Sequence, residues 1–561
     1  VQDNNNRSTD GFFMYIRPLM DSVEEITVST STPGAESAGQ GSAQIRLTTR
    51  AGSNRFAGSV YDTWRNQAGT NDDDVLTRNN KRGWLWRLNT PYWFNKRDRP
   101  KTAAGDDFID DVRLETPGFR VGGPILKDRL FYFFNWEWFK WPNQVARTRY
   151  LMNENAARGL FTYTDNSGVQ RTIDLMALAA SKGQLSTFDP ITQKLFADVR
   201  SAVTGYTGGA VSPWNLNTDK FDYSPGGDQF RHFPTGRIDY NLTESHRFTG
   251  TVRYNRFESD PDILNSAEPR FPGFTNYGGQ WSHRYSWTAT LRSTFGKNIV
   301  NEARYGYAGG TTQFYTNVTR DTFNCSDPGC TGGFFLNLLD IGGTTLTAPA
   351  PINGPSTRHT PDIVYEDTLT WLKGRHTITM GGSYTHLFGE NWNANQYAPS
   401  ISFQTASTDP AYSVFSTSAN YPGGLSTTQQ GYARNLYALL TGRVATVAGN
   451  FYQNDAGEYV YLGDRWQKFS VNVLGLFVSD SWRVKPSLTM TAGLRWELQF
   501  PFRPDNSSYA RLDDWRMVYG LTGEGNLFKP GTMTGVAPSF VQYVKGDHPY
   551  NTDWNNVAPS V

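Results

Sequence analysis

The chain has 561 residues, of which 38% are hydrophobic and 14% aromatic, and its formal net charge is +1. This balance provides no excess of positive charge for holding nucleic acid. No run of about 18 apolar residues occurs, which excludes a membrane-spanning helix but not a membrane-spanning barrel, because only alternate residues of a barrel strand face lipid. A chain of this length often forms several soluble domains, yet one large barrel can absorb it.

The first 53 residues do not alternate as a barrel strand would. Short apolar segments at 22–31 and 43–49 flank a turn region of small residues at 33–41, which predicts a compact globular element. From residue 54 the pattern changes, with Phe56, Gly58, Val60 and Trp64 on one face of the first long strand. We therefore divide the chain into residues 1–53 and 54–561.

Alternation between apolar and polar residues recurs along the rest of the chain and is most regular at 488–500. One strand ends near Phe388 and another begins near Phe469, and both points lie on the side of the long connections. An even number of strands must therefore lie between them, and we predict two, at 433–441 and 445–454. The count is then about thirteen. The other expected strands lie near 54–66, 118–122, 130–138, 237–242, 247–254, 285–295, 303–307, 363–371, 378–388, 474–482 and 488–500.

The connections alternate in length. Every second one is a short turn, and the others are long and irregular, at about 67–116, 142–232, 258–280, 310–361 and 389–432. Such connections are uncommon in compact soluble domains, whereas short turns on one side and long loops on the other are typical of outer-membrane barrels. The pattern predicts an all-β, transmembrane antiparallel barrel that is incomplete, since single-chain bacterial barrels close on an even number of strands. The alternative is a large soluble β-sandwich or propeller.

The polar face of these strands would line the barrel interior or contact an element inside it. The candidates for this face are Arg237, Arg247, Arg253, Arg292, Arg495 and Glu497.

No pattern for catalysis, a metal or a cofactor is found. The seven histidines are scattered, and no phosphate-binding glycine loop or nucleophile motif is present. Acidic runs at 72–74 and 106–111 lack the spacing of a calcium-binding EF-hand loop, so solvated loop acids are the simpler reading. Cys325 and Cys330 predict a loop disulfide, with a pair of free thiols as the alternative.

Four aromatic residues in the first long connection are candidates for stacking on a sugar or peptide ligand. Aromatic residues that pack within the loop or form an interfacial girdle are the alternative reading. These residues are Trp84, Trp86, Tyr92 and Trp93.

Several segments resemble the TonB-dependent outer-membrane receptors, in the Oar-like group that carries a carboxypeptidase-regulatory-like domain. Their order and spacing together are more specific than any one of them, and Ser479 departs from the glutamine common at its position in the group. The segments are 21–28, 35–41, 48–60 and 64–66 at the junction from plug to barrel, 122–125 with 128–133, 477–483 with 488–489 and 493–496, and 555–559.

The resemblance implies a barrel of about 22 strands around an N-terminal plug. Residues 1–53 would be the C-terminal part of the plug, and 54–561 the N-terminal portion of the barrel, so the sequence would be a fragment.

The implied function is active import of a scarce, bulky nutrient, such as an oligosaccharide, peptide or chelated metal, across the outer membrane of a Gram-negative bacterium. The implied partners are outer-membrane lipid and the TonB energy-transducing complex, with no cofactor and no catalytic step. An adhesion or secretion role in the same membrane and a secreted β-rich carbohydrate-active enzyme are the alternatives.

Overall fold

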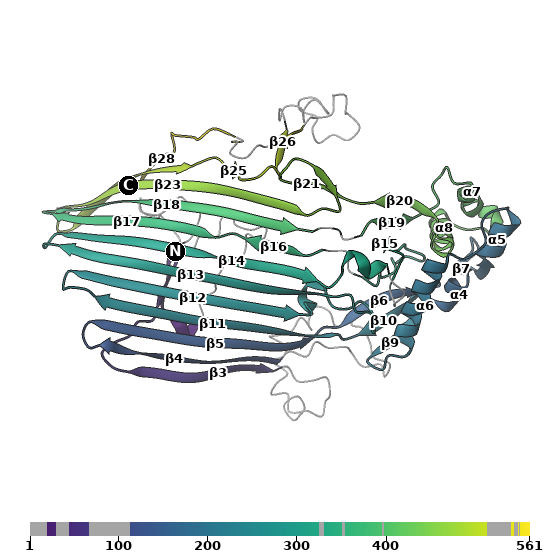
Figure 1. The fold of residues 1–561 in the computed structure, drawn as a ribbon, viewed down its shortest axis with the longest axis horizontal. Helices are drawn as coiled ribbons and strands as arrows, with labels where there is room; N and C mark the ends of the chain where they lie inside the picture. Colours follow the sequence, from purple (N-terminus) through teal and green to yellow (C-terminus); the bar gives the residue numbers. More distant parts are fainter. Residues whose placement is uncertain are drawn as a thin grey trace.

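The computed structural model describes residues 20–29, 44–66, 113–324, 330–350, 354–394, 396, 398–512, 540–542, 548 and 550–560. One 14-stranded sheet dominates it, with the order β28-β24-β23-β18-β16-β14-β13-β12-β11-β5-β4-β3 (Figure 1). β17 pairs with β14 and β18, and so continues the position of β16, while β25 pairs with β23. The strands are β3 (Ala57–Asn66), β4 (Arg113–Leu126), β5 (Leu130–Gln144), β11 (Gly226–Asn241), β12 (His246–Asp260), β13 (Gly278–Phe295), β14 (Ile299–Thr316), β16 (Ser356–His359), β17 (Asp362–Lys373), β18 (His376–Asn393), β23 (Arg465–Lys485), β24 (Leu488–Gln499), β25 (Arg503–Pro504) and β28 (Val557–Ser560).

The strands are long enough to cross a bilayer. β13 and β14 have 18 residues each and pair along their whole length, whereas a tilted membrane strand needs about 9–11. Tight turns join neighbouring strands at one end of the sheet. Gly296, between β13 and β14, and Gly374, between β17 and β18, have φ values of 62° that favour glycine. This pattern of neighbouring antiparallel strands confirms the predicted barrel architecture.

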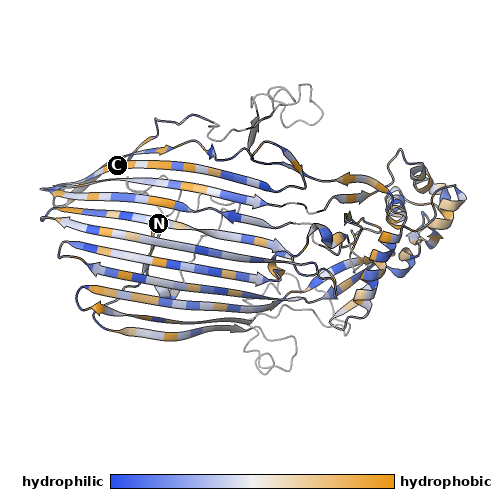
Figure 2. Ribbon diagram, in the orientation of Figure 1, coloured by the Kyte–Doolittle hydropathy of each residue, from blue (hydrophilic) through white to orange (hydrophobic). Residues whose placement is uncertain are grey.

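One face of the sheet is apolar and uncovered. Val252 is 57% exposed and Leu494 is 46% exposed, and neither lies between two packed sheets. Tyr305, Tyr365 and Tyr384 are register neighbours on three successive strands and continue this face. Hydrophobic and hydrophilic residues alternate along the strands in Figure 2. An exposed apolar face of this extent is expected where lipid covers the wall.

The two strands predicted at 433–441 and 445–454 are wrong. Residues 433–441 lie in helix α8 (Thr427–Thr441), and 445–454 fall in the short strands β20 (Val444–Ala448) and β21 (Phe451–Gln453), which pair outside the large sheet. β18 pairs directly with β23, from His376↔Trp482 to Asn393↔Arg465. Zero strands between them satisfies the same parity as two. α8 buries Gln430, Ala433 and every residue from Leu436 to Thr441, as expected of a helix that is surrounded by other elements.

Three of the long connections are not irregular, because they fold together. We call this unit the loop subdomain and define it as residues 145–225, 330–350 and 398–448; it lies at the end of the sheet opposite the tight turns (Figure 1). Besides α8 and β20, its elements are β6 (Arg147–Met152), α4 (Glu154–Ala157), β7 (Leu160–Thr164), β8 (Gln170–Asp174), α5 (Leu175–Ser181), α6 (Pro190–Thr204), β9 (Gly209–Pro213), β10 (Thr218–Tyr223), β15 (Phe335–Asn337), β19 (Ser400–Phe403), α7 (Pro410–Ser416) and η4 (Ser418–Asn420).

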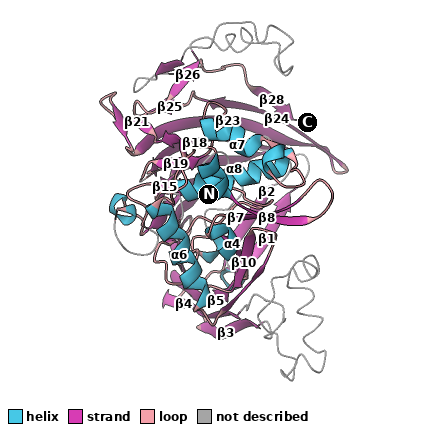
Figure 3. Ribbon diagram, turned by 90° about the vertical axis from the view of Figure 1, so that its right-hand side faces the viewer, coloured by secondary structure: helices cyan, strands magenta, loops and turns pink. Residues whose placement is uncertain are grey.

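A separate antiparallel pair precedes the large sheet. It consists of β1 (Val23–Ser29) and β2 (Gln44–Thr49), after the single turn η1 (Met20–Ser22). Viewed along the strands, the large sheet curves around the side on which this pair lies (Figure 3). The remaining short elements are η2 (Ile263–Asn265), η3 (Arg320–Phe323), β22 (Tyr459–Tyr461), β26 (Ala510–Leu512) and β27 (Phe540–Gln542).

Among the described residues, no helix combines the length and the apolar character needed to cross a membrane.

Candidate functional site

The polar face of the sheet carries the predicted charged residues, and several are paired with acids. Asp239 is only 1% exposed at its side chain and accepts from Arg237 at 2.7 Å and from Arg247 at 2.9 Å. Arg495 pairs with Glu497 at 2.7 Å on β24. Because a strand turns successive side chains to opposite faces, these groups share the face opposite to Val252 and Leu494.

The pair β1–β2 touches this polar face at its end. Arg237 donates through Nη1 to the backbone oxygen of Thr49, and Arg253 donates through Nη2 to the Thr49 hydroxyl. On the neighbouring side, Arg120 forms an ion pair of 3.4 Å with Asp21. Three guanidinium groups of the large sheet thus contact this N-terminal element, two at the end of β2 and one at η1.

The junction that follows β2 is also fixed to the wall. Asn54 donates through Nδ2 to Asp128 Oδ1 at 2.5 Å, and the Asp128 amide donates to Asn54 Oδ1 at 2.8 Å. Asp128 lies in the tight turn between β4 and β5 and has a φ of 64°. Both ends of the β2-to-β3 connection are therefore attached to the sheet.

Arg292 also lies on the polar face. It is exposed and stands opposite Arg247 in the β12–β13 register. Placement of the six predicted residues on one face agrees with the alternation in the sequence, and their role in lining a lumen stays a prediction.

The loop subdomain has its own hydrophobic core. Residues from all three connections are buried in it, including Phe161, Ile341 and Leu436. Asp409 accepts from the Ala411 amide at the start of α7, and both of its oxygens accept from Arg443 Nη1 at 2.7 Å. A core shared by segments so far apart in sequence makes these connections one folded unit rather than separate loops.

Two buried tyrosine hydroxyls of the subdomain have hydrogen-bond partners. Burial raises the pKa of the Tyr437 and Tyr421 hydroxyls, which therefore stay neutral. Each acts as a donor to a backbone oxygen, Tyr437 to Leu185 at 2.7 Å and Tyr421 to Phe415 at 3.0 Å.

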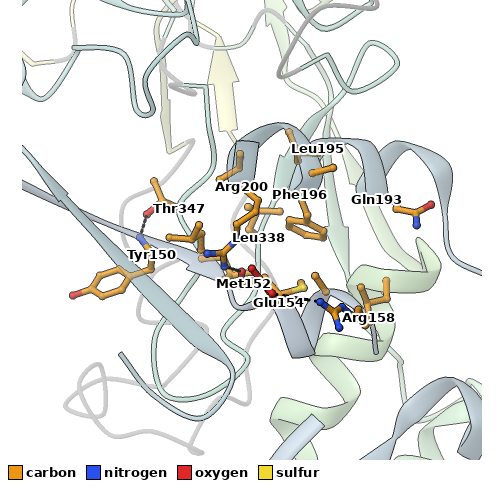
Figure 4. Close-up of a pocket in the computed structure, with 16 residues that line it drawn as sticks. Tyr150, Met152, Glu154, Arg158, Gln193, Leu195, Phe196, Arg200, Leu338 and Thr347 are labelled. Carbon is orange, nitrogen blue, oxygen red and sulfur yellow. Dashed lines mark hydrogen bonds and ion pairs between the residues drawn. The ribbon is translucent and has the colours of Figure 1, made fainter. Parts of the chain in front are cut away.

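A cavity of about 370 Å³ lies where the three connections meet (Figure 4). β6, α4 and α6 supply one side of it, and residues of the second and third connections supply the rest. The lining is mostly apolar, with Tyr150, Glu154, Arg158, Gln193, Arg200 and Thr347 as its polar members. Its size falls within the range of small-molecule sites.

Other predicted site residues fall partly outside the described chain. Trp84, Trp86, Tyr92 and Trp93 lie outside it, as do the acidic runs at 72–74 and 106–111. Cys330 is buried and disulfide-bonded, but Cys325 is not among the described residues, so the pairing stays a prediction. In the part of the chain that is described, no group of three or more His, Cys, Asp or Glu residues could hold a metal ion.

Sequence reasoning missed the loop subdomain and its cavity, although local signals for its helices are present. Asp189 caps α6 and Pro190 occupies its first turn, a common start of a helix. Ser426 caps α8, and Gly442 ends it with a φ of 66°. These residues predict helices where the alternation of strands fails.

Comparison with known proteins identifies the class. The family model described as "Outer membrane beta barrel domain" matches residues 48–561. The chain belongs to this family, and this places it in the outer membrane of a Gram-negative bacterium. No curated protein sequence matches it.

Solved structures with a similar fold include the outer membrane transporter YddB of Escherichia coli, with a TM-score of 0.40 and 9% identity over 87% of this chain and 45% of that one. The siderophore receptor PirA of Acinetobacter baumannii has a TM-score of 0.37 and 11% identity, over 87% of this chain and 46% of that one. The ferric enterobactin receptor PfeA of Pseudomonas aeruginosa, solved as a mutant, has a TM-score of 0.37 and 13% identity, over 86% of this chain and 46% of that one. The chain spans less than half the length of each of these proteins.

Proposed function

We propose that the protein is a TonB-dependent transporter that imports a scarce, bulky nutrient across the outer membrane. The β1–β2 pair would be the end of the plug within residues 1–53, and 54–561 would contribute barrel wall and external loops. The proposal assigns no covalent step to the protein. Oligosaccharides, peptides and chelated metals all remain within the proposed substrate class.

The observation that carries the proposal is the docking of η1 and β1–β2 on the polar face, through Arg120 to Asp21 of η1 and through Arg237 and Arg253 to Thr49 of β2. Among the described residues, the polar contacts of this element with the large sheet include these two hydrogen bonds and one partly exposed ion pair. Such contacts can be broken at modest cost, because each contributes only about 0–3 kcal/mol. Removing the element under force would open a path along the polar wall.

Uptake by a deletion strain, with and without a functional TonB complex, tests this function. Candidate nutrients would be supplied as the sole limiting source, and the strain complemented with the intact gene would serve as the control. We expect growth to require both the protein and TonB. Loss of cell attachment that is independent of TonB, with growth unaffected on all nutrients, would instead support an adhesion role.

A further inference from the structure

The cavity of the loop subdomain has a mainly apolar wall made by segments distant in sequence. Met152 and Phe196 come from the first connection, Leu338 and Leu346 from the second and Leu440 from the third. A compact apolar body can fill this space, and burial of its surface would drive binding by the hydrophobic effect. The polar residues of the lining then determine which polar or charged group of a ligand the cavity can bind.

Arg200 provides a partly buried cation beside the apolar wall. Both hydrogen bonds it makes within the described chain use Nη2, one to the Met152 backbone oxygen and one to Asp219 Oδ2 at 2.8 Å. A guanidinium has five N–H donors in a planar fork, so the Nε and Nη1 donors of Arg200 remain for another acceptor. Figure 4 shows this side chain in the middle of the lining residues.

Arg158 provides a second cation at the rim. Its ion pair with Glu154 is long, at 3.4 Å, and the two side chains are 69% and 70% exposed. An exposed pair of this kind contributes little to stability. The Arg158 guanidinium can therefore turn to a bound anion at small cost, while Glu154 is the one acid among the lining residues.

We propose that this cavity binds a small organic acid with a compact apolar body and a single anionic group, such as an aromatic carboxylate. The apolar body would lie against Met152, Phe196 and Leu338, and the anionic group would accept from Arg158 and Arg200. Binding would take place in the loop subdomain whether or not the protein imports the ligand, so this proposal does not depend on the proposed uptake.

The test is titration of the full chain in lipid nanodiscs with 2-naphthoate, followed by calorimetry, with empty nanodiscs subtracted. The neutral 2-naphthamide has nearly the same shape and serves as the matched ligand. We expect saturable binding of the acid and affinity about tenfold lower for the amide, because only the acid carries a negative charge that pairs with the guanidinium groups. Equal affinity for the two compounds, or no saturable binding of the acid, would overturn the proposal.

The exposed Arg158 allows a variant that leaves the core intact. Arg158→Gln should lower the affinity for 2-naphthoate about five- to tenfold and leave that for 2-naphthamide unchanged. Lys194→Gln is the control, because Lys194 also forms an i, i+4 pair, with Asp198 on α6, and does not line the cavity. The proposal fails if both variants have the same effect.

Ala157 lines the cavity and packs against the core of the loop subdomain. Ala157→Phe should fill the cavity and abolish binding of both compounds, and the melting temperature is measured to show that the variant is folded. Retention of wild-type affinity in this variant would place the ligand elsewhere. Uptake is measured separately in cells, so a negative binding result and a negative uptake result remain distinguishable.

Discussion

Asp165 shows how one carboxylate fixes a turn of the loop subdomain. Its Oδ1 accepts from the amides of Ser167 and Val169 at 2.8 and 2.9 Å, and its Oδ2 accepts from Arg171 Nε at 2.6 Å. The hydrogen bond from Arg171 and those from the two amides lower the pKa of Asp165. The ionised form is thus preferred more strongly in the folded turn than in the unfolded chain.

This lowered pKa makes the stability of the turn depend on pH. A lowered pKa contributes stability that is complete above the unfolded value, about 3.9, and is lost as pH falls through the lower folded value. We expect the amides of Ser167 and Val169 to lose protection from hydrogen exchange below about pH 4, after correction for intrinsic rates.

Two variants check this assignment. Asp165→Asn should remove the acid-dependent step, and Arg171→Gln should move it to higher pH, because the hydrogen bond from Arg171 is the main cause of the lowered pKa. A step that stays at the same pH in both variants would contradict it.

Helix α8 is the element that joins the third connection to the other two. Its buried positions include Ala433, Leu436, Tyr437 and Leu440. They lie in one hydrophobic core together with residues of the first and second connections. The end of this helix is set by Gly442, whose φ of 66° favours glycine and whose added Cβ would lie 2.8 Å from Asp189. The capping glycine also fixes the approach of α8 to the start of α6.

Gly442→Ala should therefore destabilise the loop subdomain by about 1 kcal/mol or more. Gly431, within the same helix, has only the far end of Arg434 within 3.6 Å of an added Cβ. Gly431→Ala is expected to stabilise the helix by about 0.5–1 kcal/mol. Thermal unfolding followed by protease resistance of the subdomain measures both, and effects of the same sign would count against this account of the helix end.

The barrel strands could be predicted from the sequence because lipid and the interior impose opposite demands on alternate residues. This constraint acts on the alternate positions Leu488, Met490 and Leu494, which are exposed on the apolar face of β24. No such constraint acts on residues 145–225 and 398–448, where the core is built from contacts between segments far apart in the chain. Leu436 and Phe161 share a core that neither local sequence specifies alone, so the cavity beside it could not be predicted.

At the scale of the whole molecule, the interface between the wall and the β1–β2 pair is the part most open to test. Arg253→Gln removes the contact with the Thr49 hydroxyl, and we expect the amides of β2 to exchange about five- to tenfold faster as docking weakens, in line with one charged hydrogen bond. Hydrogen exchange with mass spectrometry reads this directly.

Arg292→Gln is the matched control for this measurement. Arg292 lies on the same face, opposite Arg247 in the β12–β13 register, whereas the hydrogen bonds to Thr49 come from Arg237 and Arg253. Equal exchange in the two variants would show that Arg253 does not hold the pair.

The shared core of the loop subdomain also constrains the order in which the molecule can assemble. Its members are separated by up to a few hundred residues, and the entropy of closing such loops must be met before their contacts form. Once neighbouring strands have paired, however, the ends of the three connections already stand side by side. The subdomain should therefore consolidate last, as a late kinetic phase that follows formation of the wall, and a pulse-labelling experiment would detect its amides as the slowest to gain protection.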